Sequence, residues 1–428
     1  MSDHPADDQT RLPLANDASA HPQRIATMVV GFGARAALQA LLFVSLARQL
    51  GAENYGSFVA VLALCMICAP FSGFGAWAVM VRDTSRRPQD FRAVVGGAIM
   101  VVAVSAPFIA AAAAGICRIV LPNQVAWMPI MAVAAAETIC FPFNDLAVRA
   151  FQAFDRSIEM VAMSVFPVVA RLASLGFLML TQQHLDVGTW AVAYLCANVF
   201  SAVATMTIMA VRLGSPIFSQ ASIVPLMRES SPFALSLAIS RAQSEIEKPM
   251  LLFLSTAANA GAYAAASRLV DLLLLPINAV MEASFSSFFR AGAAGAHASR
   301  LLALRLVKWL AAYSIVCAML VILGAPFLPR LLGASFEPSV PLAMGLAGLP
   351  LLYGVYSVFA MIPQSLGRQR DNVPVIIGAG LVKVLVVLAL VPRVGAYGAV
   401  IATYATFAVA AAWLGIKLIR IRSPHHAA

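Results

Sequence analysis

The sequence is poor in charge. Only 11% of its 428 residues are Asp, Glu, Lys or Arg, whereas 61% are hydrophobic and the mean hydropathy is +0.85. Soluble domains carry about 25% charged residues, so a soluble fold is excluded and a polytopic membrane protein is predicted. In a membrane protein the net charge of +10 reflects which loops lie in the cytoplasm, so no nucleic-acid partner is expected.

Cysteine and histidine are scarce as well. The six cysteines lie almost entirely inside apolar stretches, where no disulfide framework can be read. Cys65 and Cys68 have CxxC spacing but no second pair, and the six histidines fall in tails and loops. No phosphate-binding loop of the ATPase type is present either. No metal site and no cofactor are therefore predicted, apart from a coupling proton or sodium ion.

Long apolar segments fill most of the chain. Twelve of them reach the roughly 20 residues that a helix needs to cross a bilayer, which predicts an all-α protein with twelve transmembrane helices. The predicted spans are Ile25–Ala47, Tyr55–Val81, Ala93–Gly115, Val125–Ala147, Ser157–Leu180, Trp190–Val211, Pro232–Ser255, Tyr263–Phe289, Trp309–Phe327, Val340–Ile362, Val373–Val391 and Tyr397–Ile416.

Basic residues are distributed unequally between the two sides of these spans. With the N-terminus inside, nineteen lie in cytoplasmic segments and only four in outside loops. The four outside are Arg48, Arg118, Arg330 and Arg393. Because positive loops stay in the cytoplasm, both termini are predicted to be cytoplasmic. The polar first 24 residues lack the charge pattern of a secretory signal and are expected to be a disordered tail.

The two halves of the sequence resemble each other. Gln152 precedes Arg171 by 19 residues, and Gln364 precedes Lys383 by the same spacing. Such matches predict two six-helix lobes related by a parallel pseudo-two-fold repeat, with the binding site between them. The predicted divisions are a tail at 1–24, an N-terminal lobe at 25–212, a cytoplasmic linker at 213–231, a C-terminal lobe at 232–418 and a tail at 419–428.

A second test of the repeat gives the same answer. Gly56 opens span two and Gly261 opens span eight, each with an aromatic residue two positions later. Arg35 and Arg241 precede these glycines by 21 and 20 residues. The segment Pro232–Ser255 is thereby predicted to be the counterpart of the first span.

Six basic residues are predicted to lie inside spans, where a charge costs roughly 2.5–3.5 kcal/mol on insertion scales. They are Arg35, Arg171, Arg241, Lys248, Arg268 and Lys383. A ring of such cations around a central cavity would suit a phosphate or pyrophosphate, so all six are candidate substrate-binding residues. The alternative is that each pairs with a buried acid or reaches the membrane surface; Arg268, with Asp271 at i+3, is the clearest case.

Acidic residues inside the spans are candidates for ion coupling, because a carboxylate in a wet vestibule can bind a proton or sodium ion. They are Glu137, Asp145, Glu245, Glu247 and Asp271. Glu245 could instead neutralise Arg241 at i, i+4. Glu245, Glu247 and Lys248 have no counterparts in the first span, which makes them the first place to look for coupling.

Three stretches resemble bacterial polysaccharide flippases, the transporters of O-antigen and exopolysaccharide repeat units. The best is RQLGAENYGSFVAVLALCMICAPFSGFGAWAVMVRDTSR, Arg48–Arg87, where a Leu-Gly-x-x-x-Tyr-Gly turn opens span two. GAYAAASRLVDLLLLP, Gly261–Pro276, looks like the start of the second half of these flippases, and PRVGAYGA, Pro392–Ala399, like their final turn. They belong to the multidrug/oligosaccharidyl-lipid/polysaccharide exporter superfamily.

This resemblance implies a transporter, not an enzyme, with two lobes in a V and alternating access. It implies a substrate of oligosaccharide repeat units on undecaprenyl pyrophosphate, turned from the inner to the outer leaflet of the bacterial inner membrane. Lipid-linked oligosaccharide, membrane lipids and other polysaccharide assembly proteins are the expected partners.

Alternatives to a flippase remain open. A multidrug cation antiporter of the same superfamily should have an acidic or aromatic cavity, whereas the predicted cavity is basic. A polysaccharide polymerase or ligase would need a large outside loop, and every outside loop here is short. A purely structural or assembly role would let the intramembrane charges be neutralised without loss of export.

Overall fold

The computed structural model describes residues 22–121, 125–181, 184–218 and 223–420. These residues form helices and no strand. The α-helices are α1 Pro22–Cys68, α2 Ala76–Arg86, α3 Phe91–Val120, α4 Trp127–Ala135, α5 Phe141–Ala153, α6 Ser157–Thr181, α7 Val187–Leu213, α8 Ile223–Glu245, α9 Glu247–Leu254, α10 Ala257–Ala293, α11 Ala296–Gly324, α12 Leu328–Leu332, α13 Ser339–Leu346, α14 Leu349–Ser365, α15 Asn372–Val394 and α16 Ala396–Arg420. Most of each predicted tail, 1–21 and 421–428, lies outside the described residues.

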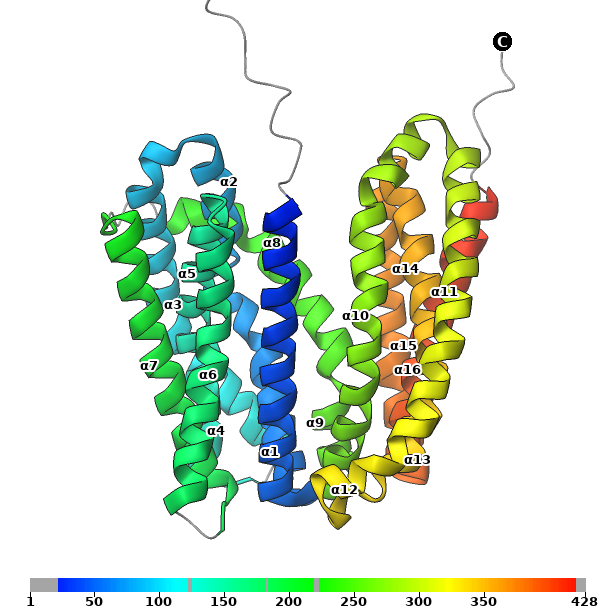
Figure 1. Ribbon diagram of the computed structural model, residues 1–428, viewed down its shortest axis with the longest axis horizontal. Helices are drawn as coiled ribbons and strands as arrows, with labels where there is room; N and C mark the ends of the chain where they lie inside the picture. The colour runs from blue at the N-terminus through cyan, green and yellow to red at the C-terminus, as the bar shows by residue number, and fades with distance from the viewer. Residues whose placement is uncertain (1–21, 122–124, 182–183, 219–222, 421–428) are drawn as a thin grey trace, which may run out of the picture.

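The helices form two bundles that stand side by side (Figure 1). Helices α1 to α7 make the first bundle and α10 to α16 the second. Helix α1 begins and α16 ends at the same end of the molecule, the upper end in Figure 1, which is called the terminal end below. The opposite end, where α12 lies, is called the distal end.

Ten helical segments in the described part of the chain are long and apolar enough to cross a membrane. The all-α, multi-pass fold is therefore confirmed, while the exact count of twelve spans stays a prediction. One segment, Val30–Ser72, contains most of the first predicted span and part of the second. It is kinked at Gly51, whose φ of 70° and ψ of 171° suit a residue without a side chain. The predicted span Pro232–Ser255 is not among the ten.

The apolar cores explain how the bundles sit against each other. At the distal end a single core joins both bundles, from Tyr55 and Phe58 of α1 to Tyr263 of α10 and Leu342 of α13. Towards the terminal end each bundle has a core of its own. The core of the first bundle surrounds Phe151, and that of the second surrounds Phe288. The bundles are thus packed together at the distal end and hold separate cores at the terminal end.

The contact between the bundles is closest where two glycines meet. A Cβ atom on Gly56 of α1 would lie 1.8 Å from the carbonyl oxygen of Ala257, and one on Gly261 of α10 would lie 2.0 Å from that of Ala52. Small residues at a helix crossing let the backbones approach in this way. The two glycines that the sequence paired as repeat counterparts are in mutual contact.

Helix α8 connects the bundles. It begins at Ile223, nine residues before the predicted span, and packs against α1, α2, α3 and the 3₁₀ turn Ala69–Ser72 of the first bundle. Helix α9 packs instead against α10, α15 and the distal part of α1. The predicted division of the sequence at 213–231 stays a prediction about the repeat; in space, the seventh predicted span is shared between both bundles.

Candidate functional site

The break between α8 and α9 lies in the middle of the charged segment. Helix α8 ends at Glu245 and α9 begins at Glu247, with Ile246 between them. Pro249 has no amide hydrogen to donate to the carbonyl of Glu245, and its ring crowds that carbonyl. The proline therefore ends the helix here and turns the charged side chains on either side of Ile246 towards different partners.

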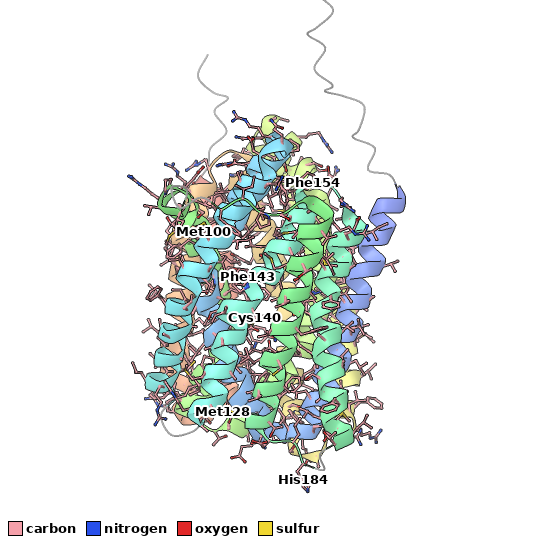
Figure 2. All side chains as sticks on the ribbon, turned by 90° about the vertical axis from the view of Figure 1, so that its left-hand side faces the viewer. Met100, Met128, Cys140, Phe143, Phe154 and His184 are labelled. Atoms are coloured by element: carbon pink, nitrogen blue, oxygen red, sulfur yellow. The ribbon has the colours of Figure 1, made fainter. Side chains whose placement is uncertain are left out.

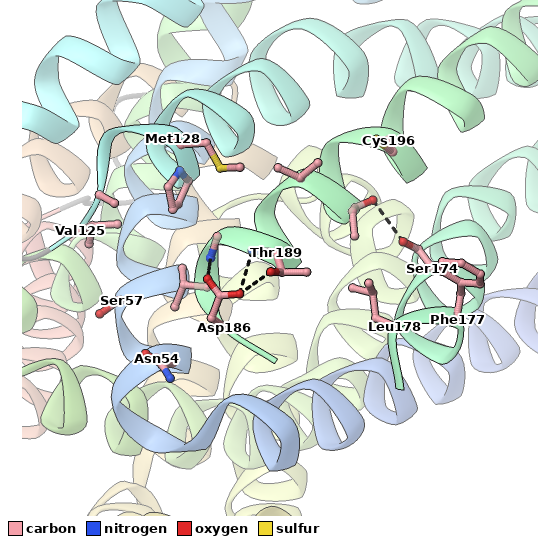
Figure 3. Close-up of a pocket in the computed structure, with 16 residues that line it drawn as sticks. Asn54, Ser57, Val125, Met128, Ser174, Phe177, Leu178, Asp186, Thr189 and Cys196 are labelled. Atoms are coloured by element: carbon pink, nitrogen blue, oxygen red, sulfur yellow. Dashed lines mark hydrogen bonds between the residues drawn. The ribbon is translucent and has the colours of Figure 1, made fainter. Parts of the chain in front are cut away.

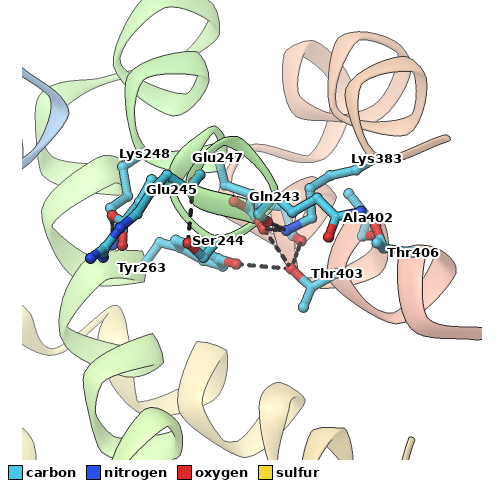
Figure 4. A network of polar contacts seen from close by, with 12 residues as sticks. Gln243, Ser244, Glu245, Glu247, Lys248, Tyr263, Lys383, Ala402, Thr403 and Thr406 are labelled. Atoms are coloured by element: carbon cyan, nitrogen blue, oxygen red, sulfur yellow. Dashed lines mark hydrogen bonds and ion pairs between the residues drawn. The ribbon is translucent and has the colours of Figure 1, made fainter. Parts of the chain in front are cut away.

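Glu247 is the hub of a buried network in the second bundle (Figure 4). Lys383 of α15 donates from Nζ to the Glu247 carboxylate and to the backbone carbonyl of Gln243. Thr403 of α16 donates to Glu247 Oε1 at 3.0 Å, and the hydroxyl of Tyr263 lies 3.0 Å from that of Thr403. The side chains of Lys383 and Glu247 are each only 4% exposed. The network ties α8 and α9 to α10, α15 and α16.

Glu245 forms a second ion pair beside this network. Its carboxylate lies 2.5 Å from Nζ of Lys248, and the two side chains are 14% and 8% exposed. The pairing of Glu245 with Arg241 that the i, i+4 spacing suggested is therefore not the one observed. A lysine at i+3 is equally within reach on a helix surface, and the break at Ile246 brings Lys248 close.

Arg268 and Asp271 lie on α10 with side chains exposed on the protein surface, although they are far from either end of that helix. Arg268 interacts electrostatically with Tyr55 of α1, with Asp271 and with Glu245. Tyr55 belongs to the first bundle, so Arg268 joins the charged cluster of the second bundle to the contact between bundles. Asp271 makes none of the ion pairs observed among the described residues.

Glu137 is the buried acid of the first bundle. It lies in a π-helical turn, Ala136–Cys140, which ends two residues before Pro142; π-helical turns are rare and often occur at functional sites. Cys140, the last residue of the turn, lies about midway between the ends of the bundle (Figure 2). The Tyr194 hydroxyl of α7 donates to Glu137 at 2.5 Å, so this carboxylate is held by a neutral donor.

Arg171 of α6 lies on the other side of the same tyrosine. Its guanidinium stacks over the Tyr194 ring, 4.7 Å from the centroid, and donates to Asn198 Oδ1 at 2.6 Å. Arg171 also interacts electrostatically with Arg35 of α1. Nε of Arg35 and Nε of Arg171 are both buried and have no hydrogen-bond partner among the described residues.

Asp145 of α5 lies near several cations. Its carboxylate is 3.3 Å from Nε of Arg149, and it interacts electrostatically with Arg241 and Arg35. Asp145, Glu137 and Arg241 also line one small pocket of about 70 Å³. The pocket lies where α8 of the seventh span meets α5 and the π-helical turn, and its other walls are largely apolar.

The eleven candidate residues therefore form two clusters rather than one ring. The first-bundle cluster holds Arg35, Arg171, Glu137, Asp145 and, from α8, Arg241. The second-bundle cluster holds Glu245, Glu247, Lys248, Arg268, Asp271 and Lys383. Sequence reasoning missed the neutral partners Tyr194, Asn198, Tyr263 and Thr403. Asn198 was open to prediction, because an amide inside an apolar span needs a partner.

A wider pocket of about 880 Å³ opens at the distal end of the first bundle (Figure 3). None of the eleven candidate residues lines it. Asp186 on its wall caps α7 by accepting hydrogen bonds from the backbone amides of Gly188 and Thr189. The hydrogen bond from the Thr189 hydroxyl is the main reason that the pKa of Asp186 lies below its ordinary value.

A protein-family model described as "Polysaccharide biosynthesis protein" matches residues 23–291. The chain belongs to this family. The match covers more than half of the chain, from the second residue of α1 to near the end of α10. No curated protein matches the sequence.

Solved structures share the fold of this polysaccharide biosynthesis protein. The "Lipid II flippase MurJ, inward closed conformation" superposes with a TM-score of 0.73 at 10% identity, over 92% of this chain and 87% of that one. A multidrug resistance MATE family transporter of the MOP superfamily matches in its inward-facing conformation with a TM-score of 0.72 at 15% identity, over 92% and 98%. An outward-facing MATE structure gives 0.60 at 14% identity, over 93% and 96%. The fold is therefore that of the MOP superfamily transporters in these structures, and the family is the one that the polysaccharide biosynthesis model describes.

Proposed function

We propose that this protein flips undecaprenyl-pyrophosphate-linked oligosaccharide repeat units from the inner to the outer leaflet of the bacterial inner membrane. Transport proceeds by alternating access and is driven by a proton or sodium ion. In this proposal the terminal end of the molecule faces the cytoplasm, as the excess of basic residues in the predicted inner loops favours.

Two arginines of the first bundle whose Nε–H groups are unsatisfied carry the proposal. Arg35 and Arg171 hold two positive charges near each other, and the Nε–H of each is buried with no acceptor in the described part of the chain. Buried donors cost free energy when they are left unpaired, and like charges repel. An anion between the two guanidinium groups would satisfy both, and a guanidinium fork fits phosphate oxygens better than most groups.

The conformation is consistent with loading from the cytoplasm. The bundles share one core at the distal end and hold separate cores at the terminal end. The TM-score is higher against the inward-facing MATE structure, 0.72, than against the outward-facing one, 0.60. Both observations support an inward state, with the terminal end on the side from which the headgroup would enter.

Asp271 is the best candidate for the coupling ion among the predicted acids. Glu247 is neutralised by Lys383, Glu245 by Lys248, and Glu137 is held by a tyrosine hydroxyl. Asp145 lies 3.3 Å from Nε of Arg149. Asp271 is exposed and makes no such ion pair among the described residues. An accessible carboxylate at this depth can take up a proton or sodium ion from water.

Headgroup binding is tested by polysaccharide export in a strain that lacks its own copy of the gene. Arg35→Gln and Arg171→Gln each remove charged hydrogen bonds worth about 1.5–3 kcal/mol, so export should fall about tenfold or more. Arg393→Gln, an exposed arginine at the end of α15, is the matched control and should export normally. Wild-type export by the first two variants, at equal membrane levels, would contradict headgroup binding.

Coupling is tested in proteoliposomes with an imposed proton or sodium gradient. Transport of a lipid-linked oligosaccharide should follow one gradient, and Asp271→Asn should make the rate independent of it. Equal gradient dependence in the variant and the wild type would exclude Asp271 as the coupling acid.

A multidrug cation antiporter is the second candidate. The pocket between α8 and the first bundle contains two acids, Glu137 and Asp145, together with the aromatic rings of Trp77 and Phe141, which suit an organic cation. Drug resistance that depends on Glu137 and Asp145, without any effect on polysaccharide export, would favour this function.

A further inference from the structure

A groove runs between α1 and α6 in the half of the first bundle that lies towards the terminal end. Its volume is about 700 Å³, and every residue that lines it is apolar or glycine. The lining residues are Val30, Gly31, Ala34, Ile158, Val161, Ala162, Val165, Phe166 and Val169. A Cβ atom on Gly31 would lie 2.2 Å from Cγ1 of Val161. The helices therefore touch at Gly31, while the small exposed side chains of Ala34 and Ala162 leave the space beside that contact open.

The two arginines with unsatisfied Nε–H groups lie next to the deep end of the groove along the two helices. Arg35 directly follows Ala34 on α1, and Arg171 follows Val169 by two residues on α6. Both Nε–H groups are buried and find no acceptor among the residues that the structure describes. At 1.5 Å per residue, Arg35 lies about 15 Å along α1 from the start of the first predicted span. The charges are thus deeper than the groove, near the middle of the bilayer.

This arrangement is the reverse of what a resident phospholipid requires. A phospholipid keeps its headgroup at the membrane surface, with its chains pointing inward, so it would place no phosphate beside Arg35. The groove instead fits a lipid whose headgroup has moved inward while its chain still lies among the helices near the starting surface. A lipid carrier in the middle of transfer has this shape.

We infer that the groove between α1 and α6 binds the polyisoprenoid chain of the lipid-linked substrate, while Arg35 and Arg171 hold the phosphate groups at its deep end. The inference rests on the proposed function and adds to it a binding site for the chain. Because the chain moves from lipid to protein and not from water, only packing contacts favour the site, and the expected gain is about tenfold in affinity.

The test is equilibrium binding to the full-length protein in lipid nanodiscs, with two probes. Undecaprenyl pyrophosphate carries headgroup and chain, and inorganic pyrophosphate carries the headgroup chemistry alone. Ala162→Phe fills the groove from α6, and Ala34→Leu fills it from α1. Ala173→Phe is the control, because Ala173 is also exposed and lies three turns further along α6 outside the groove.

Both filling variants should bind undecaprenyl pyrophosphate about tenfold more weakly and inorganic pyrophosphate as the wild type does, whereas the control binds both normally. Arg35→Gln should weaken both probes. Unchanged binding of undecaprenyl pyrophosphate by both filling variants overturns the chain site and leaves the proposed function standing. Equal displacement of that probe by phosphatidylglycerol also overturns it, since the groove would then be an ordinary lipid site. Failure of the wild type to bind either pyrophosphate overturns the proposed function as well.

Discussion

The buried pair of Lys383 and Glu247 allows two roles of a charged residue to be separated. Replacing Lys383 by methionine keeps the length of the side chain and removes the charge. Glu247 would then be a buried carboxylate, 4% exposed, whose remaining donor in the network is the Thr403 hydroxyl. Removing one partner of a buried ion pair costs about 3–5 kcal/mol, so Lys383→Met should lower the thermal stability of the purified protein markedly.

The double variant Lys383→Met, Glu247→Gln removes both charges together. It should recover most of the lost stability, because a neutral pair of similar volume leaves no buried charge. Lys308→Met, at an exposed position of α11, should change stability by less than about 0.5 kcal/mol. Unfolding followed by tryptophan fluorescence in detergent measures all three. If Lys383→Met is as stable as the wild type, or the double variant is no more stable than Lys383→Met, the reasoning is wrong.

The same variants test the prediction that Lys383 binds the headgroup. If the lysine only balances the charge of Glu247, the double variant should be stable and should also export polysaccharide. If the lysine also contacts substrate, the double variant should be stable but inactive. Stability and export together therefore separate a structural lysine from a substrate-binding one, which export alone cannot do.

Two further predictions concern the contact between bundles and the cap of α7. Gly56→Ala should destabilise the protein by about 1–3 kcal/mol, because the new Cβ would lie 1.8 Å from the carbonyl oxygen of Ala257. Gly33→Ala is the control and should not destabilise it, because no described atom lies within 4 Å of a Cβ at that position. Equal melting temperatures for the two variants would contradict the close contact. Asp186→Ala should cost about 1 kcal/mol at neutral pH. Hydrogen bonds from Thr189 lower the pKa of Asp186 in the folded protein. The ionised carboxylate therefore stabilises the fold fully at a pH above the ordinary aspartate pKa of about 3.9. This stabilisation is lost as the pH falls through the lower pKa of the folded state. The difference between variant and wild type should therefore shrink only in acid, and a difference independent of pH down to pH 3 would exclude the ionised cap.

Apolar segments and repeats were readable from the sequence because both are local or periodic. Ten helical segments with the composition of membrane spans were found where apolar runs were predicted. The equivalence of Gly56 and Gly261 came from their similar surroundings in the two halves. Their direct contact could not be predicted, because a repeat relates two positions by symmetry without saying whether they lie at the axis.

The partners of the charges were harder to predict, because helix spacing reaches only three or four residues. Lys383 has no acid within a turn of its own helix, and its partner Glu247 is 136 residues away in the sequence. Glu245 had two cations within reach, Arg241 and Lys248, and spacing could not choose between them. The choice depended on the helix break at Ile246, which required the packing of both bundles.

That break also bears on any movement between the bundles. Helix α8 packs mainly against the first bundle, but Gln243 in its last turn is hydrogen-bonded to α15, and α9 packs against the second bundle and the distal part of α1. A change in the angle between the bundles should therefore bend the chain in the last turns of α8 and at the break at Ile246. The residues on either side, Glu245 and Glu247, pair with Lys248 and Lys383, and Glu245 also interacts with Arg268 beside the contact between bundles. A headgroup or ion that changed the charge next to Arg268 would therefore act on the point where the chain has to bend. This places the asymmetric charges of the seventh predicted span where binding can be converted into movement.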